Sequence, residues 1–220
     1  MQNILEGYRL VDLSQEVYPG TLNTNNVYEW GNTLRRFEIR QFIAAIDNCT
    51  MSFVDAETHV GTHVESPAHL KPGLKSPAEL PLEKFIGEAI VLKFKDEAIG
   101  PEHLADVKEN DIVLLYSTSD KCYITPEGGR YLQSKKIKIL GVQNVWPDDP
   151  RAYEIGSGIL PETHIALLGN DIPMIENIIN LETINASRVQ FIGFPIRIHR
   201  IDSVWIRAVA LEPVAGKEEL

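Results

Sequence analysis

The chain has 220 residues, 44% hydrophobic and 24% charged, which is typical of a soluble globular protein with one substantial core. Its 21 basic and 31 acidic side chains give a net charge of −10, which argues against nucleic acid as a partner. No apolar run approaches the roughly 18 residues of a membrane span, and the N-terminal stretch lacks a signal-peptide pattern. We therefore expect a cytoplasmic protein without membrane contact, whose two cysteines, Cys49 and Cys122, are buried reduced thiols.

Short runs rich in Ile, Val and Leu predict the strands of a buried sheet. The first 55 residues give weak signals, and residues 32–47 are compatible with either a strand or a helix. The predicted strands are residues 88–94, 111–117, 137–143 and 164–169, followed by 188–198 and 204–212 as a hairpin or a closely connected pair.

Helix-start signals lie between some of these strands. Gly100-Pro101 precedes the short segment EHLADV, residues 102–107. Thr125 before Pro126 is a typical N-cap followed by proline in the first turn of a helix. Residues 172–184 could form a further helix. Strands that alternate with short helices indicate an α/β fold with a central mixed sheet. Because no linker or repeat interrupts the sequence, we expect a single domain over residues 1–220.

The stretch HVGTHVESPAH, residues 59–69, holds three of the six histidines of the chain. On an extended chain His59, His63 and Glu65 point to the same face, and Gly61 leaves an open slot between the histidines. Gly61 and Pro67 disfavour the helical alternative. We expect a strand that enters a loop.

Two imidazoles and one carboxylate on one face are typical of a divalent-metal site with a position open for water. Bound zinc lowers the pKa of that water to roughly 7 and supplies hydroxide at neutral pH. His69 could lie beside the water as general base. The competing interpretation is that these histidines fill polar gaps in the core. Further ligands could come from His164, at a predicted strand start, and from Glu176, in an apolar stretch where an unpaired carboxylate is costly.

The stretch HVGTHVESPAH resembles the His-x-Gly-Thr-His-x-Asp-x-Pro-x-His signature of the cyclase family of metal-dependent hydrolases, which includes kynurenine formamidases and isatin hydrolases. The resemblance extends to VDLSQEVYPG near the N-terminus, HIALLGNDIPMIENIINLETI, and the C-terminal FPIRIHRIDSVWIRAVAL. It implies the α/β swivelling fold of that family and assembly as a homodimer or a higher homo-oligomer.

The resemblance also implies roles for individual residues. His59, His63, His164 and Glu176 match metal ligands, and His69 matches the catalytic acid or base. Glu65 stands where the family has an aspartate that binds or bridges the metal. The implied cofactor is zinc or manganese, with one or two ions in each chain.

These observations predict a metal-dependent hydrolase that cleaves a C–N bond of a small amide or lactam by attack of metal-bound hydroxide. The segments YSTSD and GVQNVWPDDP depart from the family pattern after predicted strands, which favours a substrate other than N-formylkynurenine. Candidate pocket aromatics are Tyr28, Trp30, Tyr123 and Trp146. The alternatives are an ester or lactone hydrolase, a polyketide-type cyclase, and a non-catalytic metal-binding relative.

Overall fold

A computed structural model describes residues 6–18, 29–30, 33–34, 37–46 and 48–214. Its strands are β1 Tyr8–Asp12, β2 Glu29–Trp30, β3 Thr33–Leu34, β4 Phe37–Ile43, β5 Thr50–Ala56, β6 His63–Glu65, β7 Ile86–Phe94, β8 Ala98–Ile99, β9 Ile112–Ser117, β10 Tyr123–Ile124, β11 Ile139–Gln143, β12 Met174–Glu176, β13 Arg188–Pro195 and β14 Ser203–Pro213. The α-helices are α1 Pro67–Leu70, α2 Pro126–Ser134 and α3 Glu162–Leu168. The 3-10 helices are η1 Pro77–Glu79, η2 Leu82–Phe85, η3 Pro101–Leu104, η4 Pro150–Tyr153 and η5 Leu181–Thr183.

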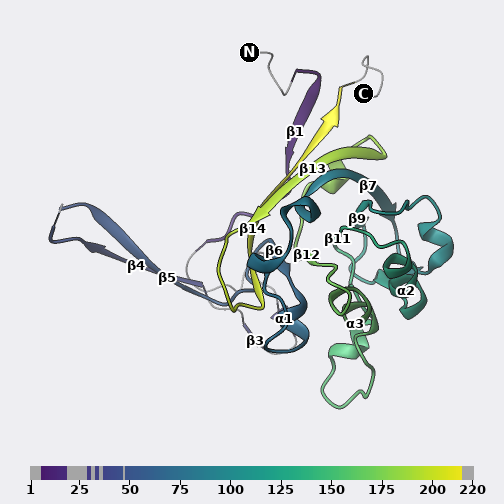
Figure 1. Ribbon diagram of the computed structural model, residues 1–220, viewed down its shortest axis with the longest axis horizontal. Helices are drawn as coiled ribbons and strands as arrows, with labels where there is room; N and C mark the ends of the chain where they lie inside the picture. Colours follow the sequence, from purple (N-terminus) through teal and green to yellow (C-terminus); the bar gives the residue numbers. More distant parts are fainter. Residues whose placement is uncertain (1–5, 19–28, 31–32, 35–36, 47, 215–220) are drawn as a thin grey trace.

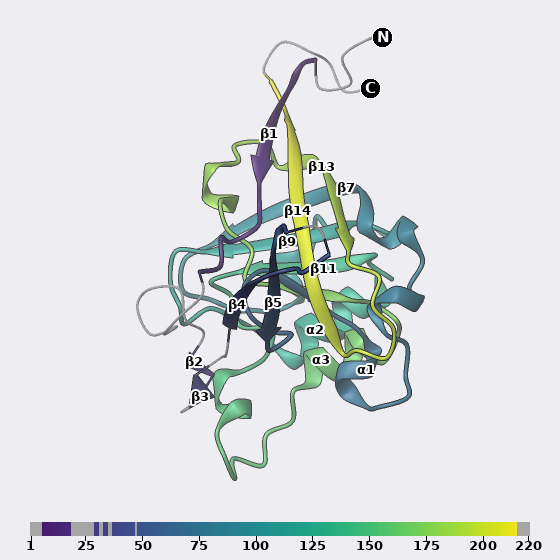
Figure 2. The same cartoon turned by 90° about the vertical axis from the view of Figure 1, so that its left-hand side faces the viewer.

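The main sheet is mixed and closes on itself. Its order is β1-β14-β13-β7-β9-β11-β12-β6, and a further pairing between β6 and β14 completes a ring. Strands β7, β9, β11 and β12 run parallel to one another, whereas the pairs β7–β13 and β12–β6 and the other pairs of the sheet are antiparallel. The long strand β14 runs through the height of the molecule and pairs at one end with β1 and at the other with β6 (Figure 2). This mixed sheet confirms the expected α/β fold class.

Both faces of the central strands are buried, which explains their uninterrupted apolar sequences. Along β9, Ile112 and Leu114 belong to one hydrophobic cluster, which includes Phe191 of β13. The alternate residues Val113 and Leu115 belong to a second cluster with residues of α2 and α3. The two helices pack against each other on that side of the sheet (Figure 1). Alternation along a strand therefore divides one apolar run between two cores.

Several expected elements are confirmed. The strands predicted at 88–94, 111–117 and 137–143 are β7, β9 and β11, and the closing pair is β13 and β14. Helix α2 begins after Thr125, whose hydroxyl accepts a hydrogen bond from the backbone N–H of Gly128 at 3.1 Å. Residues 101–104 form the short helix η3, and the described part of 32–47 contains strands β3 and β4, followed by a turn that begins after Ile43.

Other expectations were wrong. Residues 164–169 belong mostly to helix α3. Apolar residues of HIALLG, including Leu167 and Leu168, lie on one face of this helix and pack against the sheet. Residues 172–184 form no α-helix; they contain β12 and η5 around Asn180, whose φ of 67° interrupts a right-handed helix. Cys122 is buried as expected, but Cys49 is exposed. Within the described residues, none of the helices combines the length and apolarity that crossing a bilayer requires.

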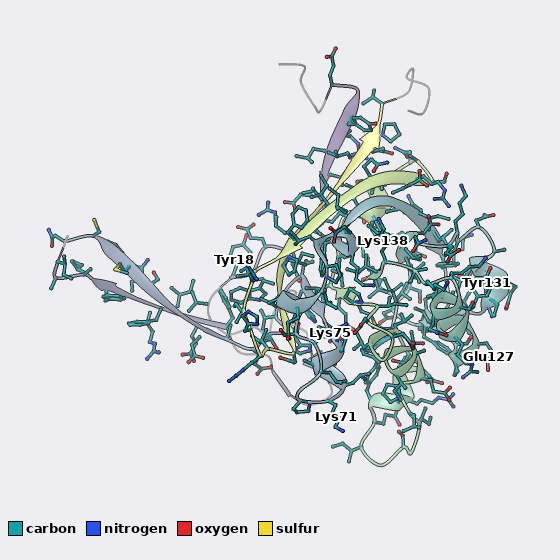
Figure 3. All side chains as sticks on the ribbon, viewed as in Figure 1. Tyr18, Lys71, Lys75, Glu127, Tyr131 and Lys138 are labelled. Atoms are coloured by element: carbon teal, nitrogen blue, oxygen red, sulfur yellow. The ribbon has the colours of Figure 1, made fainter. Side chains whose placement is uncertain are left out.

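The antiparallel strands β4 and β5 form a ribbon that projects from the rest of the molecule (Figure 1). At its base the buried ring of Phe37 packs edge-on against Trp205, with ring centroids 5.8 Å apart. Beyond this contact the large apolar side chains of the ribbon and its turn are exposed, namely Ile39, Phe42, Ile43, Ile46, Met51, Phe53 and Val54. Side chains stand on both sides of the ribbon (Figure 3). We call residues 37–56 the β4–β5 arm.

Candidate metal centre

The first part of the site is a turn between β5 and β6. His59 lies in this turn rather than on a strand, so the expectation that one strand face presents His59, His63 and Glu65 was wrong for His59. Gly61 follows with a φ of +67°, a left-handed conformation that glycine adopts without steric cost. A Cβ at Gly61 would lie 2.4 Å from the Cγ2 atom of Val17. Gly61 therefore lets the chain turn closely past Val17, instead of leaving a slot between the histidines.

The rest of the site comes from three neighbouring elements. His63 and Glu65 are two residues apart on β6, so both side chains point to the same face. Strand β12 pairs with β6 in a register that sets Glu176 opposite His63 and Met174 opposite Glu65. His164 reaches the same place from helix α3, on the buried side of that helix. Residues that are far apart in sequence thus converge where β6, β12 and α3 meet.

The distances show how closely these groups gather around Glu65. Its Oε1 atom lies 3.0 Å from Nε2 of His59, 3.7 Å from Nε2 of His63 and 3.7 Å from Nε2 of His69. Its Oε2 atom lies 3.2 Å from Nε2 of His164. Glu176 lies 3.7 Å from His63 and 3.9 Å from His164, measured between the carboxylate oxygens and Nε2. All six candidate residues of the sequence are brought together.

The described residues contain two groups of side chains with the composition and spacing of metal ligands. One is His59, Glu65 and His69, and the other is His63, Glu65 and Glu176. In each group the ligand atoms lie within 4.8 Å of one another. Glu65 belongs to both groups.

Three buried atoms of this cluster have no hydrogen-bond partner in the structure. They are Nε2 of His63, Oε2 of Glu65 and Oε1 of Glu176. The Oε2 atom of Glu65 approaches His164 without hydrogen-bond geometry, so proximity does not satisfy it. Buried polar atoms without partners are costly unless a ligand completes them. Imidazole nitrogens and carboxylate oxygens are suitable ligands for zinc and manganese, so these residues fit a divalent ion.

The electrostatics of the cluster also favour a cation. Burial and the charge of Glu65 raise the pKa of Glu176 to about 7, because two neighbouring buried carboxylates repel each other when both are ionised. Burial alone would raise the pKa of Glu65, but the neighbouring imidazoles of His164, His59 and His63 hold it well below its usual range. A bound cation would stabilise both carboxylates in their ionised form.

In His59, His63 and His164, the Nδ1 atom has a hydrogen-bond partner of its own, and the Nε2 atom faces the cluster. The Nδ1 atom of His63 lies 2.8 Å from the carbonyl oxygen of Gly61, and Nδ1 of His59 lies 2.9 Å from the hydroxyl of Thr58. The Nδ1 atom of His164 pairs with Oδ2 of Asp148. Burial alone would lower the pKa of His164, but the hydrogen bond with Asp148 and the negative charge of Glu65 raise it well above its usual range. Such partners fix the orientation and the tautomer of metal-binding histidines.

His69 differs from the other histidines because its side chain is 34% exposed. It lies at the end of α1, with Nδ1 3.3 Å from Oδ2 of Asp202 and 3.2 Å from Nε2 of His59. Burial alone would lower the pKa of His69, but the hydrogen bond with Asp202 and the charge of Glu65 raise it. Burial alone would raise the pKa of Asp202, which His69 and His59 instead lower to about 2.

The sequence interpretation missed Asp148 and Asp202. Asp148 is buried after β11, in the segment WPDDP, and its Oδ1 atom also accepts the backbone N–H of Thr163 at 2.6 Å. Asp202 lies in the connection between β13 and β14. The sequence signal that could have found them is that each functional histidine needs a hydrogen-bond acceptor at its second ring nitrogen. A search for acidic residues that follow the predicted strands would have used this requirement.

A cavity of about 370 Å³ lies beside Asp148. Its lining includes Tyr123, Thr125 and Leu160 but none of the six clustered residues, so the role of Tyr123 as a pocket aromatic stays a prediction. Trp146 contacts the ring of Tyr153 at 5.7 Å, and Tyr153 in turn packs edge-on against His164 at 6.3 Å. Tyr28 and the side chain of Trp30 lie outside the described residues.

Comparison with known proteins gives consistent results. A family model named Cyclase and described as "Putative cyclase" matches residues 11–149. The kynurenine formamidase of Salinibacter ruber is 29% identical over 211 residues, which cover 91% of this chain and 96% of that protein. The kynurenine formamidase of Erythrobacter litoralis is 24% identical, with 94% and 96% covered. Isatin hydrolase A from Labrenzia aggregata, bound to benzyl benzoate, superposes with a TM-score of 0.75 at 21% identity, with 94% and 95% covered.

Proposed function

The chain belongs to the cyclase family, and from this premise we propose that it is a metal-dependent hydrolase that cleaves the C–N bond of a small amide or lactam. The observation that carries the proposal is the buried cluster in which two groups of candidate metal ligands share Glu65 and leave three polar atoms without hydrogen-bond partners. The names of the relatives support the reaction class, since kynurenine formamidases and isatin hydrolases act on amide bonds.

We assign His59, His63, Glu65, His164 and Glu176 as the residues that hold the metal, which we propose to be zinc or manganese, with one or two ions in each chain. When bound, such an ion polarises a carbonyl group and makes water a better nucleophile at neutral pH. The protein residues keep the Nε2 atoms turned inward and exclude bulk water, because five of the six clustered side chains are buried.

His69 is assigned as the general acid and base. It is the one partly exposed member of the cluster, and its Nε2 atom faces Glu65 at 3.7 Å, so it can reach both a substrate and the metal ligands. An imidazole in this position accepts a proton from water and returns it to the leaving amine. No covalent intermediate with the protein is needed for this reaction.

The first experiment is elemental analysis of protein purified without chelator, beside His59→Ala/His63→Ala protein. We expect one or two divalent ions in each chain, and their loss from the double variant. The metal-loaded protein is then tested on formanilide, isatin, N-formylkynurenine and phenyl acetate. Hydrolysis of an amide or lactam supports the proposal. Hydrolysis of the ester alone would favour an esterase, whereas tight metal binding without hydrolysis would favour a non-catalytic relative.

The His69→Ala variant separates binding from chemistry. We expect it to keep its metal content, because the remaining five residues of the cluster are unchanged. Its turnover should fall by about 100-fold to 10,000-fold, the range for removal of a general acid–base group. Retained turnover in this variant would overturn the role of His69.

We also propose that the chain assembles as a homodimer or a higher homo-oligomer. The β4–β5 arm supports this assembly, because an isolated two-stranded ribbon is marginally stable and monomers rarely expose large apolar patches. The stacked rings of Phe42 and Phe53, 4.8 Å apart, form an exposed anchor on one face of the arm.

Light scattering tests the assembly directly. We expect a mass of at least two chains, and a lower mass for Phe42→Ser/Phe53→Ser. Leu82→Ser, which changes an exposed leucine away from the arm, is the control and should keep the assembled mass. A wild-type monomer at micromolar concentration would contradict the proposal. The single domain over residues 1–220 and the cytoplasmic location are further proposals, tested by one cooperative unfolding transition and by cell fractionation.

A further inference from the structure

Asp202 is held in place by the strand pairing that positions the cluster of candidate metal-binding residues. Strand β14 begins one residue later and pairs with β6, with Ser203 opposite Glu65. The carbonyl oxygen of Asp202 accepts the backbone N–H of Ser66 at 3.1 Å and the Ser66 hydroxyl at 2.9 Å. The backbone of Asp202 is therefore tied to the segment between Glu65 and His69.

The carboxylate of Asp202 contacts both sides of the turn that carries His59. Its Oδ1 atom accepts a hydrogen bond from the Thr58 hydroxyl at 3.3 Å, and its Oδ2 atom lies 3.3 Å from Nδ1 of His69. Because the Thr58 hydroxyl donates its single proton to Asp202, it acts as acceptor toward Nδ1 of His59 at 2.9 Å. One carboxylate thus sets the direction of two neighbouring hydrogen bonds.

Two groups compete for Nδ1 of His69. Nε2 of His59 lies 3.2 Å away and Oδ2 of Asp202 lies 3.3 Å away. The Nε2 atom of His59 also faces Glu65 at 3.0 Å and belongs to a candidate ligand group. A nitrogen that binds a metal through its lone pair cannot also accept a hydrogen bond. Asp202 is then the acceptor that remains for a proton on Nδ1.

We infer that Asp202 is a positioning residue that keeps the His69 proton on Nδ1 and turns the unprotonated Nε2 toward the metal cluster. This inference rests on the proposed function, because it assigns Asp202 a role through the general base. The second nitrogen of a catalytic histidine commonly requires such a partner to select its tautomer. None of the metal-ligand assignments includes Asp202.

The Asp202→Asn variant tests the inference with little change in shape. The Asn oxygen can still accept from Thr58, whereas its amide donates toward Nδ1 of His69 and favours the opposite tautomer. We expect unchanged metal content, unchanged KM and a kcat about 10-fold to 100-fold lower, the usual range for loss of an orienting partner. Asp12→Asn, which changes a similarly exposed aspartate paired with Arg207, is the control and should retain wild-type kcat.

A double-variant comparison shows whether Asp202 acts through His69. If it does, Asp202→Asn combined with His69→Ala has the kcat of His69→Ala alone, because the two changes are coupled. A further fall in the combined variant, a wild-type kcat in Asp202→Asn, or loss of metal from Asp202→Asn would each overturn the inference.

A second readout does not depend on turnover. Long-range proton–nitrogen NMR of the zinc-loaded protein reports which ring nitrogen of His69 carries the proton, with His69→Ala used to assign the signal. We expect a protonated Nδ1 in the wild type and a protonated Nε2 in Asp202→Asn. The same tautomer in both proteins would overturn the inference. If the wild type hydrolyses none of the probes, the proposed function fails, and this spectrum still decides whether Asp202 positions His69.

Discussion

Glu65 and His164 meet in the core of the site, with Oε2 of the carboxylate 3.2 Å from Nε2 of the imidazole. The other oxygen of Glu65 faces His59, His63 and His69. Glu65 therefore joins the residues of the turn and β6 to the helix that carries His164. Its longer side chain still reaches the centre of the cluster, although the family signature has an aspartate at this position.

Glu65→Gln should abolish most metal binding. The change removes the charge that both candidate ligand groups share, and it should weaken zinc binding by more than about 100-fold, beyond the usual loss for an orienting partner. Zinc titration by calorimetry measures the effect. Glu83→Gln, which changes an exposed glutamate in η2, is the control. Zinc affinity within 10-fold of the wild type would show that Glu65 does not bridge.

Asp148→Asn should weaken metal binding without removing a metal ligand. Asp148 pairs with Nδ1 of His164, and an amide there would donate to that nitrogen and favour the wrong tautomer. We expect a loss of zinc affinity of about 10-fold to 100-fold. The neighbouring Asp149→Asn breaks a surface pair with Arg151 and is the matched control. Equal zinc affinity in the two variants would contradict the role given to Asp148.

The site residues could be predicted from the sequence because the residue types that carry their chemistry are rarely clustered along a chain. The sequence placed His59, His63, Glu65, His69, His164 and Glu176 in one site, and the structure brings all six together. The conformation of the segments was harder to predict. The apolar sequence HIALLG predicts a strand that begins at His164, whereas in the structure the apolar side chains of this run cover one face of α3. An apolar run of six residues carries too little periodicity to separate a buried strand from a buried helix.

Asp148 and Asp202 were missed for a different reason. Their functions depend on hydrogen bonds to His164 and His69, which lie 16 and 133 positions away in the sequence. Such contacts are created by the pairing of β14 with β6 and by the packing of α3, neither of which leaves a local motif. Single acidic residues in loops are common, so only the folded arrangement distinguishes these two.

Gly61→Ala should destabilise the protein and disturb the metal site. The left-handed conformation costs an alanine about 1–2 kcal/mol, and the new Cβ would also meet Cγ2 of Val17 at 2.4 Å. Urea unfolding measures the decrease in the free energy of unfolding, which should be larger for Gly61→Ala than for Gly73→Ala. Gly73 also has a positive φ, of 92°, but nothing lies within 4 Å of a Cβ there. If both variants lose the same stability, the close approach of Val17 is unimportant.

Glu212 should stabilise the fold at neutral pH and lose this effect in acid. Its carboxylate accepts the backbone N–H groups of Asn185 and Ala186, at 2.5 and 2.9 Å, and pairs with Arg9. Burial alone would raise the pKa of Glu212, but these bonds lower it. A carboxyl whose pKa is lowered by folding contributes stability above its unfolded pKa of about 4.3, and the contribution disappears as the pH falls through the folded value.

Glu212→Gln should therefore lower the free energy of unfolding by about 1.5–3 kcal/mol at pH 7, the range for hydrogen bonds to a charged group. The difference from the wild type should narrow below about pH 4, because the wild-type carboxyl becomes protonated there. Urea unfolding at both pH values measures it, with Glu83→Gln as an exposed control. A difference that stays constant between pH 7 and pH 3 would show that the charge of Glu212 is not what ties β14 to residues 185–186.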